Sequence, residues 1–141
     1  DALLERFYQQ WKNEPLVVDL WLGIQASSPS PKALDYVKEL MGHESFEMTN
    51  PNKVRALIGA FCNGNAVNFN KLDGSGYRFL ADRVIDLNKL NPQIAARLLG
   101  GLTRWRKYNK TRQDLMRGEL KRILAESNLS PDVYEVASRS C

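Results

Sequence analysis

Residues 73–86 read DGSGYRFLADRVID, and this stretch repeats apolar side chains at the intervals of an α-helix. The apolar positions, spaced i, i+3, i+4, i+7 and i+8, are Tyr77, Leu80, Ala81, Val84 and Ile85. Charged side chains fall on another face, at Arg78, Asp82 and Asp86. The pattern predicts an amphipathic helix that begins near Tyr77 and buries one face in a core.

Six further stretches show apolar residues at helical spacing. They are Leu4, Phe7, Tyr8 and Trp11; Val17, Leu20, Trp21 and Ile24; Leu34, Val37 and Met41; Val54, Leu57, Ile58 and Phe61; Leu98, Leu102 and Trp105; and Met116, Leu120 and Ile123. No stretch shows the sustained alternation of a strand. The sequence therefore predicts an all-α protein with seven to nine helices.

Prolines indicate where the helices begin. Five of the six follow a residue that can precede a helix, in the pairs Glu14-Pro15, Ser30-Pro31, Asn50-Pro51, Asn91-Pro92 and Ser130-Pro131. Proline suits the first helical position because the amide it lacks has no partner inside the helix. Short turns between helices make sequence neighbours pack antiparallel. We expect residues 1–141 to form one helical domain, an α-solenoid of antiparallel helix pairs, although a compact bundle also fits the pattern. The first stripe lacks a cap, so we expect the end fragment of a larger array.

Composition allows a stable core without a disulfide or a metal. The chain has 141 residues, of which 43% are hydrophobic, and a net charge of +4. Two cysteines, Cys62 and Cys141, cannot build a disulfide framework. No apolar run approaches the roughly 20 residues of a membrane span, and no signal peptide opens the sequence. We therefore expect no membrane partner and a cytoplasmic location.

The residues needed for metal chemistry are scarce. His43 is the only histidine, and the sequence HESFE at residues 43–47 lacks the second histidine of a zinc peptidase helix. Two distant cysteines and one histidine cannot form an ordinary zinc site. We expect a surface turn at His43, with no metal ligand and no catalytic residue in the chain.

Two glycine-rich stretches have structural interpretations. Asp73-Gly74-Ser75-Gly76 resembles a phosphate loop, but no strand precedes it and no Lys-Ser/Thr follows. The glycines instead supply a turn, and Asp73 or Ser75 caps the next helix. Gly100-Gly101 interrupts a helical pattern, which predicts a helix break or the close approach of another backbone.

Positive charge is concentrated between Gly101 and Ala125. This segment carries eight basic and two acidic residues, whereas the rest of the chain has a net charge of −2. Such a segment is either a solvated helix face or a surface for phosphates or acidic partners. The alternative function is thus a free-standing scaffold or nucleic-acid-binding module. Trp105, however, shares its stripe with Leu98 and Leu102, which favours a core position over base stacking.

Several motifs in one order resemble a known family. They are DLWLGIQASSP at residues 19–29, NPNKVRALIGAF at 50–61, Asn68-Phe69, DGSGYRFL at 73–80, LNPQIAAR at 90–97, RWRKY at 104–108, Arg112-Gln113 and LSPDVYE at 129–135. Together they resemble the C-terminal end of the aminopeptidase N family of zinc-dependent gluzincin aminopeptidases. The resemblance covers nearly the whole chain.

The resemblance implies a role without catalysis. In that family the last domain is an α-helical superhelix that covers an upstream catalytic domain and leaves a cavity for peptides. The zinc-binding His-Glu-x-x-His motif and the Gly-Ala-Met-Glu-Asn motif belong to the catalytic domain, and neither occurs here. The implied partners are the catalytic domain of the same polypeptide and peptide substrates, with no nucleic acid. Zinc is the cofactor of the parent enzyme, a hydrolase of peptide breakdown.

Two arginines are candidate substrate contacts. The resemblance implies that Arg55, in NKVRAL, and Arg97, in AARL, face the cavity. Each lies on the flank of an apolar stripe, where its stem can pack while its head stays in water. The guanidinium can bind a carboxylate or a carbonyl. The alternative is a structural partnership with a helix end or a nearby acidic residue.

Overall fold

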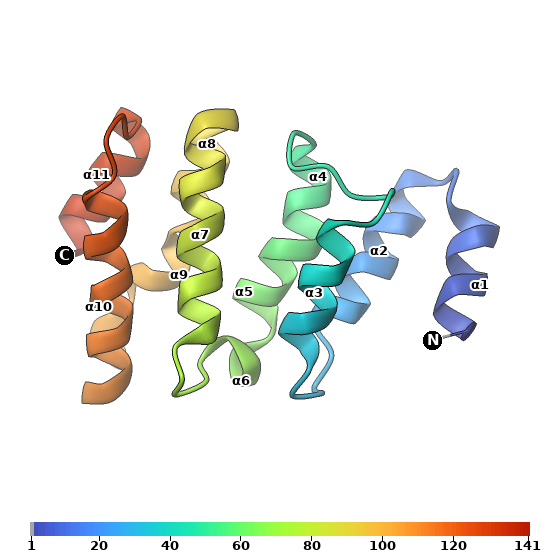
Figure 1. Cartoon of the computed structure of the whole chain (residues 1–141), viewed down its shortest axis with the longest axis horizontal. Helices are drawn as coiled ribbons and strands as arrows, with labels where there is room; N and C mark the ends of the chain where they lie inside the picture. Colours follow the sequence, from blue (N-terminus) through green and yellow to red (C-terminus); the bar gives the residue numbers. More distant parts are fainter. Residues whose placement is uncertain (1) are drawn as a thin grey trace. The chain divides into compact units, whose positions relative to one another are not determined.

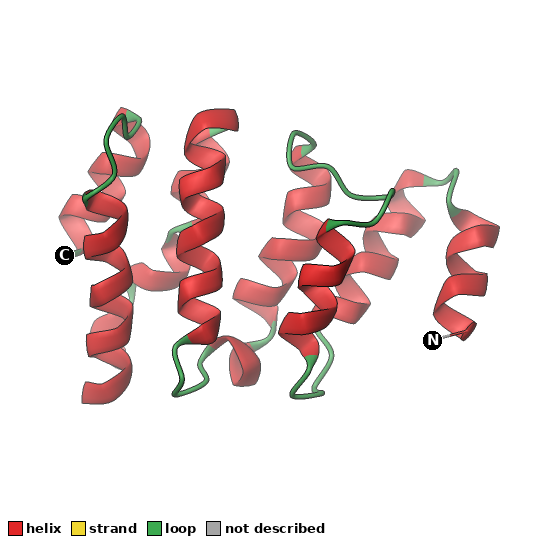
Figure 2. Cartoon of the chain, in the orientation of Figure 1, coloured by secondary structure: helices red, strands yellow, loops and turns green. Residues whose placement is uncertain are grey.

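The computed structural model describes residues 2–141, and every regular element among them is helical (Figure 2). The α-helices are α1 (Ala2–Trp11), α2 (Pro15–Ala26), α3 (Ala33–Met41), α4 (Pro51–Val54), α5 (Ala60–Gly64), α6 (Ala66–Phe69), α7 (Ser75–Leu90), α8 (Pro92–Leu98), α9 (Gly100–Thr103), α10 (Lys110–Leu124) and α11 (Pro131–Ser140). A π-helical segment, η1 (Arg55–Gly59), joins α4 to α5, and a 3₁₀ segment, η2 (Trp105–Lys107), follows α9. The all-α prediction is confirmed.

The helices are more divided than the sequence predicts. The π-helical segment splits one continuous helical stretch, and the pattern after Pro92 breaks into α8, α9 and η2. The break predicted at Gly100-Gly101 occurs at Leu99. Leu80 approaches Gly101 so closely that a Cβ there would lie 2.7 Å from Leu80 Cδ1, so a side chain rather than a backbone fills this space. No helix within residues 2–141 is long and apolar enough to cross a membrane.

Proline and asparagine begin helices largely as predicted. Asn50, Asn91 and Ser130 each accept a hydrogen bond from a backbone N–H in the first turn of the helix that follows. Glu14 makes no such bond, although Pro15 begins α2. The prediction for Ser30-Pro31 is wrong by two residues: α3 begins at Ala33, because a turn that closes on Ser30 comes first.

The chain divides into two compact units, Asp1–Asn68 and Phe69–Cys141. In the first unit, α2 packs against α1, α3, η1 and α5 (Figure 1). The core contains Leu22, Val37, Leu57, Ile58 and Phe61, all fully buried. A hydrogen-bonded pair of buried asparagines holds the loop after α2, because Asn65 donates to the carbonyls of Ala26 and Ser28 at 2.9 and 2.8 Å.

In the second unit, α7 packs against α8 and α10, and α11 contacts α8 and α10. The predicted stripe of α7 is buried at Tyr77, Leu80, Ala81 and Val84. Its start is tightly fixed. Gly74 adopts φ 75°, and a Cβ at Gly76 would lie 2.1 Å from the carbonyl oxygen of Phe69. Only glycine fits such an approach.

The N-cap of α7 is Gly74, not Asp73 or Ser75 as predicted, but Asp73, one residue earlier, contributes to the start of the helix. Its carboxylate accepts a 2.8 Å hydrogen bond from the Ser75 N–H. Hydrogen bonds from the Ser75 hydroxyl and backbone hold the pKa of Asp73 below its usual value. The loop is thus accounted for by helix initiation.

Two predicted stripes are wrong in part. In α1, Tyr8 is buried but Phe7 and Trp11 are exposed. In α2, Trp21 is buried as predicted, whereas Leu20 and Ile24 are exposed and Val18, Leu22 and Ala26 are buried in their place. Because α2 carries apolar residues on nearly every side, spacing alone does not identify its buried face.

Candidate functional site

Arg55 lies at the first residue of the π-helical segment η1. Asn50 caps α4 just before it, and Lys53 ties this helix to α2 through a 2.5 Å ion pair with Asp19. The Arg55 side chain is exposed, and its Nη2 donates to Asn52 Oδ1 at 2.5 Å. A guanidinium has five N–H donors, so this bond leaves donors for a ligand. Single π-turns within helices are frequent at functional sites.

A polar pocket of about 270 Å³ lies beside this helix in the first unit. Its lining residues are Tyr8, Lys12, Pro15, Val18, Asp19, Glu44, Ser45, Asn50, Asn52 and Lys53. Asn52, which accepts the hydrogen bond from Arg55, is one of the residues that line this pocket. The Tyr8 hydroxyl donates to Glu44 Oε1 at 3.1 Å, and burial together with this carboxylate raises the pKa of Tyr8. The pocket is therefore lined by two cationic side chains, Lys12 and Lys53, and two anionic ones, Asp19 and Glu44.

Arg97 lies near the end of α8 and is exposed. It lines an open depression of about 390 Å³ in the second unit, together with Gln93, Ala96, Asp132, Glu135 and Val136. The two carboxylates belong to α11, and Glu135 also pairs with Arg139 at 3.0 Å. Acidic neighbours lower the local positive potential. This setting suits hydrogen bonding to a neutral carbonyl or amide better than capture of a free anion.

His43 occupies the turn after α3 and packs between aromatic rings. Its ring lies 4.5 Å from that of Tyr8 and 5.2 Å from that of Trp21. Ser45 N–H donates to His43 Nδ1 at 3.1 Å. Among residues 2–141, no group of three His, Cys, Asp or Glu side chains could hold a metal ion. The histidine that the sequence placed in a surface turn lies in that turn and has a packing role.

The basic segment is partly neutralised, and its tryptophan is covered. Trp105 is 9% exposed and donates to the Ser140 carbonyl at 2.6 Å. The guanidinium groups of Arg106 and Arg117 lie 4.3 and 4.8 Å from its ring centre. Arg122 pairs with Asp82 and Glu119, each at 2.8 Å. The predicted core position of Trp105 is confirmed, and its ring offers no open platform for a base.

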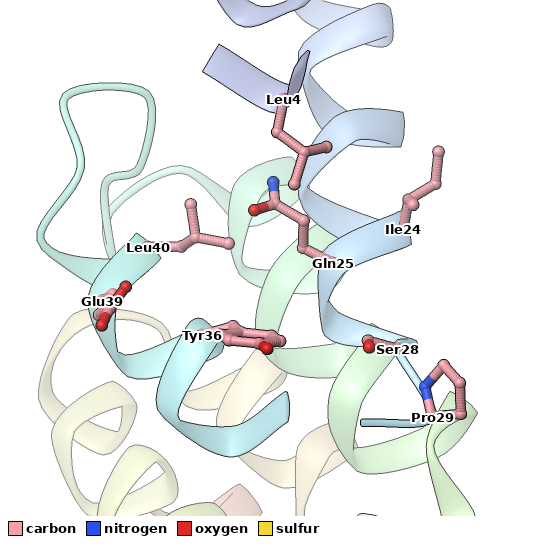
Figure 3. Close-up of a pocket in the computed structure, with 8 residues that line it drawn as sticks. All are labelled: Leu4, Ile24, Gln25, Ser28, Pro29, Tyr36, Glu39 and Leu40. Carbon is pink, nitrogen blue, oxygen red and sulfur yellow. The ribbon is translucent and has the colours of Figure 1, made fainter. Parts of the chain in front are cut away.

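A larger and more apolar pocket, of about 490 Å³, lies among α1, α2 and α3 (Figure 3). Its lining residues are Leu4, Ile24, Gln25, Ser28, Pro29, Tyr36, Glu39 and Leu40. Leu4 of α1 and Ile24 of α2 lie at one rim of the pocket, and Leu40 of α3 forms part of the opposite wall (Figure 3). No sequence pattern predicted this pocket, because its wall combines the flanks of three helices with the loop after α2.

Comparison with known proteins places these features in context. A family model described as a domain of unknown function with ARM repeats (DUF3458_C) matches residues 1–141. ARM repeats are stacked helical units, in agreement with the predicted α-solenoid class.

Curated relatives align over nearly the whole chain. The chain is 46% identical over 140 residues to the aminopeptidase N of Caulobacter vibrioides, and 44% identical over 135 residues to that of Haemophilus influenzae. It is 43% identical over 140 residues to the aminopeptidase N of Escherichia coli. These alignments cover 96–99% of this chain but only 16% of each relative.

A solved structure is similar as well. The crystal structure of Legionella pneumophila aminopeptidase A in complex with aspartic acid superimposes with a TM-score of 0.94 at 42% identity. The match covers 99% of this chain and 16% of that chain. The similarity thus concerns one helical part of a much longer protein.

Proposed function

The chain belongs to this ARM-repeat family and corresponds to the C-terminal helical domain of aminopeptidase N-type proteins, and from this premise we propose that it serves a zinc metallo-aminopeptidase as a non-catalytic domain. Residues 1–141 act as one domain that covers the active-site cavity, admits peptides and orients them. The observation that carries the proposal is the alignment of 96–99% of the chain with three aminopeptidases N at 43–46% identity.

The residues of this chain do not fit the zinc that the family implies. His43 is the only histidine, and its Nδ1 already accepts from the Ser45 backbone. The part of the chain that the structure describes has no three-ligand cluster. The metal and the peptide-cleaving groups therefore belong to the rest of the polypeptide. This domain contributes by positioning, which raises the fraction of bound peptides in a reactive geometry.

Arg55 is proposed to contact peptide. Its guanidinium is exposed, its backbone begins the π-helical segment η1, and one of its N–H groups is hydrogen-bonded to Asn52. The remaining donors can bind a carboxylate or a backbone carbonyl, and a charge-assisted bond of this kind is stronger than a neutral one.

Arg97 is proposed to contact peptide more weakly. Asp132 and Glu135 share its depression and compete for the guanidinium. Its contact therefore favours a peptide carbonyl or amide, and we expect its loss to matter less than that of Arg55.

The nucleic-acid alternative receives less support. Stacking on bases requires an open aromatic face, and Arg106 and Arg117 lie over the Trp105 ring. We propose no nucleic-acid partner. We also propose a cytoplasmic enzyme, because Cys62 and Cys141, the two cysteines within residues 2–141, form no disulfide.

The test measures kcat and KM of the full-length enzyme with an alanine anilide and with a tetrapeptide. Arg55→Ala and Arg97→Ala should raise KM for the tetrapeptide, by roughly tenfold for Arg55, as expected from loss of about 1.5 kcal/mol of charge-assisted hydrogen bonding. The anilide, too short to reach this domain, should change less. Arg6→Ala is the matched control, because Arg6 is an exposed arginine on α1 that lines neither pocket. If both variants change KM equally for the anilide and the tetrapeptide while the melting temperature falls by many degrees, the arginines are structural.

A further inference from the structure

Arg55 has a partner of a different chemistry from those of the paired arginines elsewhere in the chain. Its Nη2 donates to the side-chain oxygen of Asn52 at 2.5 Å, and this oxygen belongs to a neutral amide. Three other arginines pair with carboxylates: Arg83 with Asp86, Arg122 with Asp82 and Glu119, and Arg139 with Glu135. Among residues 2–141, no carboxylate forms an ion pair with Arg55. Asn52 therefore holds the guanidinium without neutralising its charge.

The backbone that carries Asn52 is fixed. Asn52 is the second residue of α4, and the Asn50 side chain accepts hydrogen bonds from the backbone N–H groups of Asn52 and Lys53, at 3.0 and 3.4 Å. Lys53 Nζ donates in turn to Asp19 at 2.5 Å and to the Pro15 carbonyl at 3.3 Å, both on α2. The acceptor oxygen of Asn52 is thus carried by a helical turn that is tied to a neighbouring helix.

The backbone that carries Arg55 is closely packed as well. Arg55 begins η1, and a Cβ at Gly23 of α2 would lie 3.4 Å from the carbonyl oxygen of Ala56, the next residue. The side chains of Arg55 and Asn52, by contrast, are both exposed. A hydrogen bond between two exposed side chains three residues apart on one helix adds little to stability. Its main effect is to restrict the rotamers of a long and flexible side chain.

Such a restriction favours ligand binding. A group that is already held in its bound conformation loses less freedom when the ligand arrives. A guanidinium recognises a carbonyl or a carboxylate through a planar fork of N–H groups, so the orientation of this plane decides whether two hydrogen bonds can form or only one. Asn52 engages one N–H of Arg55, and the remaining N–H groups and the full positive charge stay available to a ligand.

We propose that Asn52 is a positioning residue for Arg55: its amide oxygen orients the guanidinium toward the peptide and leaves the positive charge free for a peptide carbonyl or carboxylate. The inference rests on the proposed function, in which Arg55 contacts peptide, and adds the residue that sets the direction of this contact. Asn52 also lines the polar pocket of the first unit. A direct contact between Asn52 and the peptide is therefore the competing explanation, and the test below separates the two.

The experiment is a double-mutant cycle in the full-length enzyme, with kcat and KM measured for a tetrapeptide and for an alanine anilide. Asn52→Ala should raise KM for the tetrapeptide by roughly three- to fivefold, because Arg55 keeps its charge but loses the hydrogen bond that orients it. The kcat for this substrate and the melting temperature should stay close to those of the unmodified enzyme. In an Arg55→Ala background the same substitution should change KM by less than about twofold. Asn63→Ala, which replaces an exposed asparagine of α5, is the matched control and should leave KM unchanged.

A second variant tests whether the partner must be neutral. Asn52→Asp keeps an acceptor beside Arg55 but adds a negative charge that competes with the peptide for the guanidinium. It should raise KM for the tetrapeptide at least as much as Asn52→Ala does. An unchanged KM for Asn52→Asp would overturn the claim that the amide preserves the charge of Arg55.

Three further outcomes would overturn the proposal. A rise in KM that persists in the Arg55→Ala background would show that Asn52 binds the peptide directly. Equal rises for the tetrapeptide and the anilide, together with a lower melting temperature, would assign Asn52 to stability. If Arg55→Ala raises KM for the tetrapeptide and Asn52→Ala does not, this inference alone fails. If Arg55→Ala itself has no effect, the proposed peptide contact of Arg55 fails, and the inference fails with it.

Discussion

The two compact units of the chain differ in net charge and in the large apolar side chains that they leave exposed. The first unit has eight acidic and six basic residues and exposes large apolar side chains along α1 and α2: Leu3, Phe7, Trp11, Leu16, Leu20 and Ile24. The second unit has eight acidic and fourteen basic residues, and its exposed large apolar side chains, Leu72, Leu90 and Tyr134, are scattered. The second unit is therefore the more basic of the two and exposes few large apolar side chains, whereas the first unit exposes more of them, mostly on α1 and α2.

Both units nevertheless fix their loops in the same way. In the first unit Asn65 holds the loop after α2, and in the second Asn88 holds the loop after α10 by bonding Asn128 and Ser130. Buried amides satisfy backbone groups that loops would otherwise leave unpaired. The units thus differ in surface charge and in the apolar side chains that they expose, while their loops are held by the same kind of buried amide.

The largest effect is expected at the tightest point of the second unit. Gly76→Ala would place a Cβ 2.1 Å from the Phe69 carbonyl oxygen, and backbone cannot move aside as a flexible side chain can. We expect a loss of about 3 kcal/mol or more in the free energy of unfolding. Gly100→Ala is the control, because a Cβ there meets nothing within 4 Å. Urea unfolding of the 141-residue chain measures both, and similar midpoints for the two variants would contradict the close packing.

The next effect separates the two faces of α2. Leu22 is fully buried, so Leu22→Ala should destabilise the 141-residue chain by about 3 kcal/mol. Leu20→Ala should change it by less than about 0.5 kcal/mol, because surface substitutions remove few contacts. Chemical denaturation of the 141-residue chain measures both variants, and equal losses of stability for Leu22→Ala and Leu20→Ala would contradict the assignment of the buried face of α2.

The smallest effect concerns pH. The pKa of Asp73 is lowered in the folded chain by Ser75, so its carboxylate stabilises the fold above the carboxyl pKa of the unfolded chain. That contribution is lost as pH falls through the lower folded pKa. Asp73→Asn should slightly lower stability at neutral pH and flatten its decline in acid. Melting temperatures recorded from pH 7 downward would show parallel curves for both proteins if this hydrogen bond were unimportant.

The same contrast explains how much of the structure could be predicted from the sequence. The α7 stripe, apart from the half-buried Ile85, and the stripe at Met116, Leu120 and Ile123 are buried as predicted, because each helix has one apolar and one charged face. In α2 the spacing chose Leu20 and Ile24, and the structure buries Val18 and Leu22 instead. In α2 the apolar residues lie on nearly every side, so spacing alone does not identify the buried face. In α1 the stripe is one-sided, but Phe7 and Trp11 are exposed, because spacing does not say whether a partner covers the apolar face.

The candidate site was less accessible to sequence reasoning. Spacing placed Arg55 and Arg97 beside apolar stripes, and both are exposed. It gave no indication of the π-turn at Arg55 or of the acidic neighbours of Arg97, because these depend on backbone geometry and on a distant helix. Their contact with peptide stays a prediction.

The most direct measurement compares the hydrolysis of an alanine anilide by the full-length polypeptide and by the purified 141-residue chain. A non-catalytic domain predicts that the full-length protein cleaves the anilide, that a chelator abolishes this activity and zinc restores it, and that the chain alone shows no activity and no stoichiometric zinc. Chelator-sensitive hydrolysis by the 141-residue chain itself, or an inactive full-length protein, would contradict the assignment.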